Sequence, residues 1–369
     1  MRTPLSADER LTRDVQRLCC AGLDSLTLRE AAVARMAQTL PFDAYCCFTT
    51  DPMTRFFTHT VMGGAPQSDL DYFIEHVYFD DEINQFSRMA QIRQVVAVLS
   101  EGTGGTLESS LCYREILRPR GHAHQLRSVF MVKQELWGGI ELSREPRRGD
   151  FNARETALMS RLAAHLGAGL KAAALRGMLD SAHAENDTPG LLTLDRQGRI
   201  VNYNIAAERW LRELGWPASE RDDATRTPQP IRTALAALRR ALSSDTEATL
   251  AQIPRLNVQA SSGRWLSILV DAALPGPDRS AETMVLIEPI TPREAAWLRR
   301  SAYDLTAREQ EVAELVVRGM ATREIALALH ITEYTVQDHL SHIFDKVGVR
   351  SRRQLAKRLF FDSFAASQQ

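Results

Sequence analysis

Apolar positions between Leu305 and Phe360 recur at helical spacing in three successive segments. The longest segment carries Val336, Leu340 and Ile343 at steps of four and three, which places them on one side of a helix. Two shorter segments before it have the same kind of stripe, made of Val312, Leu315 and Val316, and then of Ile325, Ala326 and Leu329. The pattern predicts three consecutive helices.

Polar residues mark the ends of these helices. Thr306 and Glu309 have the spacing of a capping box, in which each side chain accepts a hydrogen bond from an amide of the first turn. Gly319 ends the first helix, and Thr332 caps the third after a short turn at His330 and Ile331. A short helix, a turn and a longer helix form the helix-turn-helix arrangement, whose second helix enters the major groove of DNA.

The first half of the chain has the pattern of a mixed helix and strand domain. An early helix carries Leu28 to Leu40, and Pro41 ends it. Strands are predicted over 44–50, 56–62, 127–133 and 137–143, the last two as a hairpin, and Phe151, Asn152 and Glu155 then start a long helix.

A second pattern of strand, turn, strand and helix begins after the linker-like 186–190. Asp195 and Gly198 form the turn, and Asn204 caps the helix. An amphipathic helix over 231–243 and two alternating strands over 264–272 and 283–288 complete it.

Composition narrows the class of protein. The 369 residues are 44% hydrophobic and 25% charged with a net charge of −1, as in an ordinary globular protein. No apolar run approaches 18 residues, and the start MRTPLSADER has no apolar core of a secretory signal, so we expect a cytoplasmic protein without a membrane span.

The five cysteines are odd in number and contain no C-x-x-C, which argues against a disulfide framework or a zinc module. Buried thiols are expected, and redox sensing is the alternative. His122 and His124 are expected in a surface loop, with metal or haem ligation as the alternative. No metal site and no cofactor is predicted. A phosphate-binding G-x-x-x-x-G-K-[ST], a nucleophile elbow and a phosphoacceptor pattern are absent from the sequence, so an enzyme is the weakest functional class.

Four blocks resemble the LuxR/GerE family of DNA-binding domains: LTAREQEV, GMATREIA, ITEYTVQDH and KVGVRSR. The resemblance implies a core, listed as Leu305, Val312, Ile325, Ala326, Ile331, Val336 and Ile343. It implies that Gln337, Asp338 and Ser341 face base edges. It assigns phosphate contacts to Thr335, Lys346, Arg350, Ser351 and Arg352, of which Lys346, Arg350 and Arg352 are expected beyond the recognition helix. Where this chain has Gln337 the family commonly has Lys, so the operator sequence stays open.

The charge pattern supports the same part of the chain. Between Lys346 and Arg358 the sequence contains bases and no acid, as expected of a stripe that binds phosphates. A solvated helix face is the alternative explanation.

The two preceding regions resemble a GAF domain and the opening of a PAS domain, respectively. The predicted fold class is therefore α+β: GAF-like and PAS-like antiparallel α/β sensor domains followed by an all-α four-helix LuxR-type domain. The predicted organisation is a GAF-like domain over 1–180, a PAS-like domain over 186–290, a linker over 291–302 and the DNA-binding domain over 303–369.

GAF-like sheets cover a cavity with the segment that follows their second strand. Here that segment includes the aromatic and acidic 69–87. Candidate lining residues are Cys47, Phe57, Tyr72, Phe73, Tyr78, Phe86, Phe130 and Trp137. An unidentified apolar or aromatic effector is expected there, with a filled aromatic core as the equal alternative.

These observations predict a one-component transcriptional regulator. Its expected partners are an operator in double-stranded DNA, a small-molecule effector and a second copy of the chain, and RNA polymerase is a further candidate. The stretch Met159–Leu179 and the helix Arg353–Phe361 are the predicted dimer contacts, with packing of 159–179 onto its own sheet as the alternative. A regulator controlled by a protein partner and an enzyme located on DNA by its tail are the competing classes.

Overall fold

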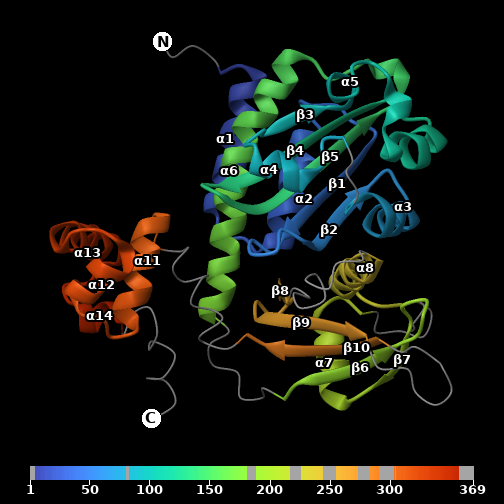
Figure 1. Ribbon diagram of the computed structural model, residues 1–369. Helices are drawn as coiled ribbons and strands as arrows, with labels where there is room; N and C mark the ends of the chain where they lie inside the picture. Colours follow the sequence, from blue (N-terminus) through green and yellow to red (C-terminus); the bar gives the residue numbers. More distant parts are fainter. Residues whose placement is uncertain are drawn as a thin grey trace. The chain divides into compact units, whose positions relative to one another are not determined.

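The structure, a computed structural model, describes most of the chain in two compact units (Figure 1). The described residues are 5–79, 83–180, 188–216, 226–243, 255–272, 283–290, 303 and 305–356. Two antiparallel sheets with their helices form the first unit, and the C-terminal helices belong to the second. The predicted α+β class is confirmed. The predicted linker 291–302 lies outside the described residues, and the predicted domain boundaries remain predictions.

The first sheet has the order β2-β1-β5-β4-β3, and all its neighbours are antiparallel. The four predicted strands are present, whereas α1 and the three-residue β3 were not predicted. The elements are α1 (Ala7–Cys20), α2 (Ser25–Met36), β1 (Ala44–Thr50), β2 (Phe57–Gly63), β3 (Val96–Val98), β4 (His124–Val132), β5 (Glu135–Arg144), the short turn η5 (Pro146–Arg148) and α6 (Ala153–Asp180).

The long helix α6 lies beside α1 on one side of this sheet (Figure 1). Its apolar stripe is buried within its own domain, namely Met159, Leu162, Leu166, Leu170 and Ala173. The two helices approach closely where Gly169 of α6 meets Cys19 of α1. A Cβ added at Gly169 would lie only 2.7 Å from Sγ of Cys19, so the position has no room for a side chain. The predicted dimer contact through this stripe is therefore wrong, and the alternative of packing onto its own sheet holds.

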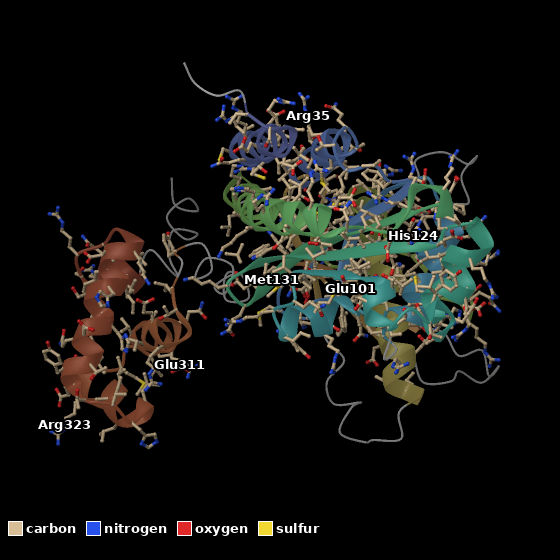
Figure 2. The ribbon with its side chains drawn as sticks, turned by 90° about the horizontal axis from the view of Figure 1, so that it is seen from above. Arg35, Glu101, His124, Met131, Glu311 and Arg323 are labelled. Carbon is tan, nitrogen blue, oxygen red and sulfur yellow. The ribbon has the colours of Figure 1, made fainter. Side chains whose placement is uncertain are left out.

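The opposite face of the sheet is covered by a chain of short helical segments. They are α3 (Gln67–Tyr72), η1 (Phe73–Val77), α4 (Phe86–Gln91), α5 (Leu99–Gly102), η2 (Leu107–Ser109), η3 (Tyr113–Leu117) and η4 (Arg118–Arg120). Figure 2 shows β4 from above, with His124 and Met131 near its two ends. His122, expected in a surface loop, is instead buried, and its Nδ1 lies 3.0 Å from Oγ of Ser143.

The second sheet repeats the strand order of the first as β7-β6-β10-β9-β8. As predicted, Asn204 caps α7 by accepting a hydrogen bond of 2.7 Å from the amide of Ala207. The four-residue β8 was not predicted, and the PAS-like resemblance stays a prediction. The elements are β6 (Gly190–Leu194), β7 (Ile200–Tyr203), α7 (Ile205–Glu213), α8 (Gln229–Ser243), β8 (Leu256–Gln259), β9 (Trp265–Ala272) and β10 (Thr283–Pro289).

Helix α8 contacts both sheets of this unit, since it packs against β9 and β8 on one side and β2 and η1 on the other. Backbone groups of β8 add polar contacts to the first domain. The amide of Asn257 donates to Oδ2 of Asp51 over 3.0 Å, and Nε2 of His59 lies 2.9 Å from the carbonyl oxygen of Gln259. Burial raises the pKa of the Asp51 carboxyl to about 6.

The second unit contains the predicted helices in the predicted order. They are α11 (Ala307–Val317), α12 (Thr322–Leu329), α13 (Glu333–Val347) and α14 (Arg352–Ala356). The capping box is formed, with Oγ1 of Thr306 3.2 Å from the amide of Glu309 and the reciprocal bond at 2.6 Å. Leu355 is fully buried in this core, so it does not contribute to the predicted C-terminal dimer contact, whose residues 357–361 lie outside the described residues.

Candidate nucleic-acid interface and candidate ligand cavity

One face of α13 is buried in the helical core, so the side chains on its opposite face point outward. Val336, Leu340, Ile343 and Val347 are buried against α11, α12 and α14. Of the other predicted core residues, only Ile331 is half-buried; Leu305, Val312, Ile325 and Ala326 are buried.

The predicted base-reading residues lie on the outer face of α13. Gln337, Asp338 and Ser341 are all exposed, and they follow each other within one helical turn. Oγ1 of Thr332 accepts a hydrogen bond of 3.1 Å from the amide of Thr335, which fixes the start of the helix. The outer face therefore begins at a capped helix end, and base readout by these residues stays a prediction.

Tyr334, which was not among the predicted site residues, extends the same outer face toward the start of α13. It lies three and four residues before Gln337 and Asp338, and it is 82% exposed. The helical phase of the predicted stripe could have found it, because residues three or four apart share a face.

Thr322 joins the outer face of α13 to the predicted phosphate-binding residues. Its Oγ1 accepts from Nε2 of Gln337 at 3.3 Å and from Nη2 of Arg352 at 2.8 Å. Nη1 of Arg352 also donates to the carbonyl of Met320 over 3.0 Å. Arg352 and Gln337 are therefore oriented by one hydroxyl at the start of α12.

Lys346 is placed differently from the prediction. It lies in the last turn of α13 rather than beyond the helix, and its Nζ is 2.7 Å and 2.9 Å from the two carboxylate oxygens of Glu309. Burial opposes ionisation of Glu309, but hydrogen bonds from Lys346 and Thr306 outweigh it and lower the pKa of this carboxyl. A structural role of Lys346 is thus visible, and its phosphate contact stays a prediction.

The other predicted phosphate-binding residues surround the end of α13. Arg350 is exposed, and Oγ of Ser351 accepts from the amide of Gln354 over 3.2 Å. Together with Thr335 and Arg352, they remain predicted phosphate contacts.

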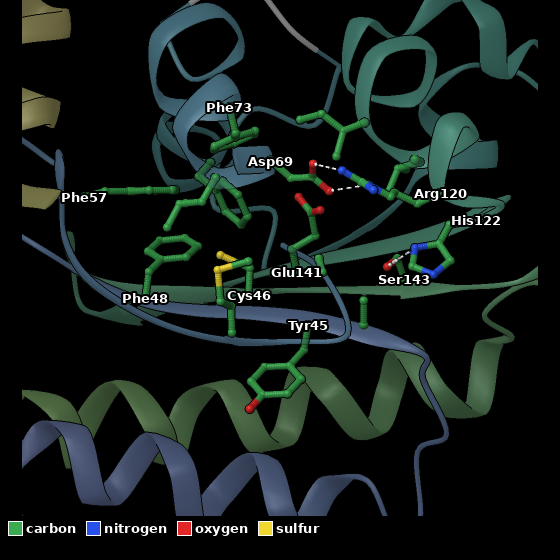
Figure 3. A pocket seen from close by; sticks show the side chains of 17 residues that line it. Tyr45, Cys46, Phe48, Phe57, Asp69, Phe73, Arg120, His122, Glu141 and Ser143 are labelled. Carbon is green, nitrogen blue, oxygen red and sulfur yellow. Dashed lines mark hydrogen bonds and ion pairs between the residues drawn. The ribbon is translucent and has the colours of Figure 1, made fainter. Parts of the chain in front are cut away.

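A cavity of about 60 Å³ lies between the first sheet and the segments that cover it. Cys46, Phe48 and Glu141 point from the sheet into the cavity, whereas Tyr45 points to the helices on the other side (Figure 3). This alternation follows from strand geometry, in which successive side chains point to opposite faces.

Most of the cavity wall is apolar. Phe48 and Phe57 stack with ring centroids 3.8 Å apart, and Phe57 stacks on Phe73 at 5.8 Å. Phe86 completes this aromatic cluster, with its ring edge-on to Phe48 at 4.7 Å. The cavity is smaller than the roughly 300–1,000 Å³ of common ligand pockets, so only a very small molecule would fit it.

An ion pair connects two covering segments at the cavity. Asp69 of α3 accepts two hydrogen bonds from Arg120 of η4, at 2.8 Å and 3.0 Å (Figure 3). The two residues are 51 positions apart in sequence, so the pair joins two covering segments that are distant along the chain.

Glu141 gives the floor of the cavity a carboxylate. Its Oε2 accepts from Nε of Arg127 at 3.0 Å, and among the described residues none donates to its Oε1. The Ser143–His122 pair lies beside it on the cavity wall (Figure 3). Such a floor can accept a hydrogen bond from a ligand whose body rests on the phenylalanines.

The structure brings only part of the predicted pocket together. Phe57, Phe73 and Phe86 line the cavity. The expectation is not met for Cys47, Tyr72, Tyr78, Phe130 and Trp137, none of which lines it. Strand alternation explains Cys47, because its neighbour Cys46 already points into the cavity.

Two of the remaining residues are engaged elsewhere. Nε1 of Trp137 donates to Glu135 over 3.1 Å, and Lys171 of α6 lies over its ring. The hydroxyl of Tyr78 donates to the carbonyl of Arg55 over 2.5 Å. The polar residues Asp69, Arg120 and Glu141 were missed; Arg127 lies opposite Glu141 because the register of the hairpin shifts between Phe130 and Met131.

The packing of α11 to α14 and the outward face of α13 together define a helix-turn-helix DNA-binding domain. Residues 303–359 match the family described as bacterial regulatory proteins, luxR family. The spore germination protein GerE of Bacillus subtilis is 47% identical over 55 residues, which are 15% of this chain and 74% of that protein. The chain belongs to the LuxR family of regulatory proteins.

Other relatives match the same part of the chain. The nitrate/nitrite response regulator NarL of Escherichia coli is 38% identical over 84 residues, or 21% of this chain. The match spans only 39% of NarL's length. A GAF domain from a Coxiella burnetii phosphoenolpyruvate-protein phosphotransferase is 18% identical and covers 46% of this chain and 95% of that chain, with a TM-score of 0.35.

A structure of a Vibrio cholera VqmA–ligand–DNA complex is 20% identical and covers 48% of this chain and 84% of that chain, with a TM-score of 0.25. These structural likenesses are weak. The fold of the first domain is established by its own strand order, β2-β1-β5-β4-β3. Among the described helices, none is long and apolar enough to cross a membrane. Within the described ranges, no cluster of three or more His, Cys, Asp or Glu side chains is arranged to hold a metal ion.

Proposed function

We propose that this chain is a transcriptional regulator in which a small molecule in the first-domain cavity controls DNA binding by the C-terminal domain. The observation that carries the proposal is the cavity floor, where the carboxylate of Glu141 lines a space walled mostly by apolar side chains. DNA binding is supported by the helix-turn-helix geometry and by the LuxR-family match. Gln337, Asp338 and Ser341 are proposed to read bases, with Tyr334 beside them, where a tyrosine ring can contact a thymine methyl group.

The chemistry of the cavity defines the class of effector. The space of about 60 Å³ and the four phenylalanines select a small, mostly apolar or aromatic molecule. The carboxylate of Glu141 favours one with an N–H or O–H donor. A hydrogen bond to a charged group contributes about 1.5–3 kcal/mol, so it should dominate specificity in so small a site.

We expect native mass spectrometry of the full chain, purified from its own host, to show a bound small molecule. Replacing Ala65, which lines the cavity, by leucine should abolish the bound mass by filling the space. Glu141→Gln should weaken retention by at least about tenfold, because the charged acceptor is lost. Ala21→Leu adds the same side chain at an exposed position and should retain the molecule. An empty wild-type chain, or equal retention by Ala65→Leu, would contradict the proposal.

Control by a protein partner is the second candidate function, and the second sheet supplies an observation for it. Leu191 and Met284 are 46% and 47% exposed, and Leu191 is paired across the strands with Leu286. This apolar face could receive a partner or a second copy of the chain, as a two-fold arrangement on two half-sites requires. In the same mass spectra, a co-purified protein without a small molecule would favour this second candidate.

A further inference from the structure

The short helix α3 contacts both the cavity and α8. Helix α8 belongs to the second domain, the one built on the second sheet, β6 to β10. Leu70 lines the cavity, and it also packs with Ile74 against Ala236 of α8. Met62 and Cys46, which line the cavity too, border the same apolar cluster. One layer of side chains therefore separates the cavity from α8.

Ion pairs reinforce this shared wall from both sides. Asp69 pairs with Arg120 at the cavity. Two residues later, Asp71 pairs with Arg226, at 2.6 Å, and with Arg232 of α8. Since Asp69 and Asp71 belong to one six-residue helix, a shift that breaks one set of pairs strains the other.

The ion pairs of Asp71 are partly shielded from solvent, so they can contribute to holding α3 in place. The side chain of Asp71 is 30% exposed and that of Arg232 is 15% exposed, so solvent screens this contact less than a fully exposed pair. Gln229 adds a further contact from α8, because its Nε2 donates to Oγ1 of Thr60 on β2 over 2.6 Å. The second domain thus holds both α3 and the neighbouring strand.

We propose that Asp71 is a positioning residue for the cavity: through Arg226 and Arg232, the second domain holds α3 closed and so sets how readily a ligand enters. This inference deepens the proposed function, because it assigns the regulation of the same cavity. Linkage then runs both ways, since a ligand that moves α3 changes the contact with α8 by the same free energy.

Cys46 offers a probe of this wall that needs no ligand. Its thiol lines the cavity, whereas Cys19, Cys47 and Cys112 are buried and Cys20 is exposed. In a Cys20→Ser chain, the rate of reaction of Cys46 with methyl methanethiosulfonate, located by peptide mass spectrometry, reports opening of the wall.

We expect Asp71→Asn to speed labelling of Cys46 by roughly two- to fivefold, which corresponds to the loss of a partly sheltered ion pair. Asp69→Asn should also speed it, because it opens the wall directly. Asp8→Asn, which removes an ion pair with Arg154 elsewhere in the unit, should have no effect. In a chain that carries Arg226→Gln and Arg232→Gln, Asp71→Asn should add nothing, since residues of one network are not additive.

Two results would overturn the assignment. One is a rate for Asp71→Asn equal to that of Asp8→Asn. The other is faster labelling of Cys19 and Cys47 together with Cys46, which indicates general loosening. Because labelling and ligand retention are measured separately, faster labelling of a chain that stays empty in native mass spectrometry would reject the small-molecule proposal alone. Unchanged labelling of a chain with a bound molecule would reject the role of Asp71 alone.

Discussion

Replacing Gln337 by alanine should cost about 1–3 kcal/mol on the duplex that the wild-type chain selects from a random pool, and little on a scrambled duplex. Gln337 is exposed on the outer face of α13, where an amide can form two hydrogen bonds with adenine. Its hydrogen bond to Thr322 is long, at 3.3 Å, so the side chain is released to DNA at small cost.

Arg350→Ala is the matched control for Gln337→Ala. Arg350 is exposed just beyond α13 and is predicted to contact a phosphate. Its loss should weaken both duplexes about equally and reduce the dependence of affinity on salt by about one charge. Fluorescence anisotropy at several salt concentrations measures both effects. Equal losses on both duplexes for Gln337→Ala would reject base readout by this residue.

Replacing Lys346 by methionine should destabilise the packing of α13 on α11 by about 1–3 kcal/mol at neutral pH. The side chain of Glu309 is only 6% exposed, so loss of Lys346 leaves a buried carboxylate with its strongest donor missing. Lys346→Arg retains a cation and should recover most of the stability. Hydrogen–deuterium exchange of peptides from α11 and α13 in the full chain measures this local stability.

The effect of Lys346 depends on pH with a definite sign. The pKa of Glu309 is lowered in the folded chain from its ordinary 4.5, so the pair stabilises the fold above that pH. The contribution is lost as pH falls below 4.5 towards the lowered folded pKa. The wild-type chain and Lys346→Met should therefore converge in exchange protection at acidic pH. A difference that stays constant through this range would reject the ion pair as its cause.

The helix-turn-helix was predictable because its signals are local. Periodic apolar residues, the Thr306–Glu309 box and Gly319 each act within a few residues, and all were found in place. Most strands were also predicted, including the four-residue β7, which follows the turn at Asp195 and Gly198, whereas the three-residue β3 and the four-residue β8 were not.

The cavity was only partly predictable because its side chains come from distant segments. Aromatic content identified Phe57, Phe73 and Phe86, but it could not separate those facing the cavity from those facing α6, such as Trp137. The pair of Asp69 and Arg120 depends on how the covering segments fold back, which no local pattern encodes. The stripe on α6 had two equal interpretations, and burial against its own domain decided between them.

The most direct test of control by the cavity compares the DNA affinity of one preparation in two states. Fluorescence anisotropy on the selected duplex is measured for the chain as purified with its bound molecule, and again after that molecule has been removed by reversible denaturation. An allosteric coupling of about 1–3 kcal/mol predicts affinities that differ by about 5- to 150-fold. The Ala65→Leu chain should show one affinity in both preparations. Identical affinities for the loaded and emptied wild-type chain would contradict the proposal that the cavity controls DNA binding.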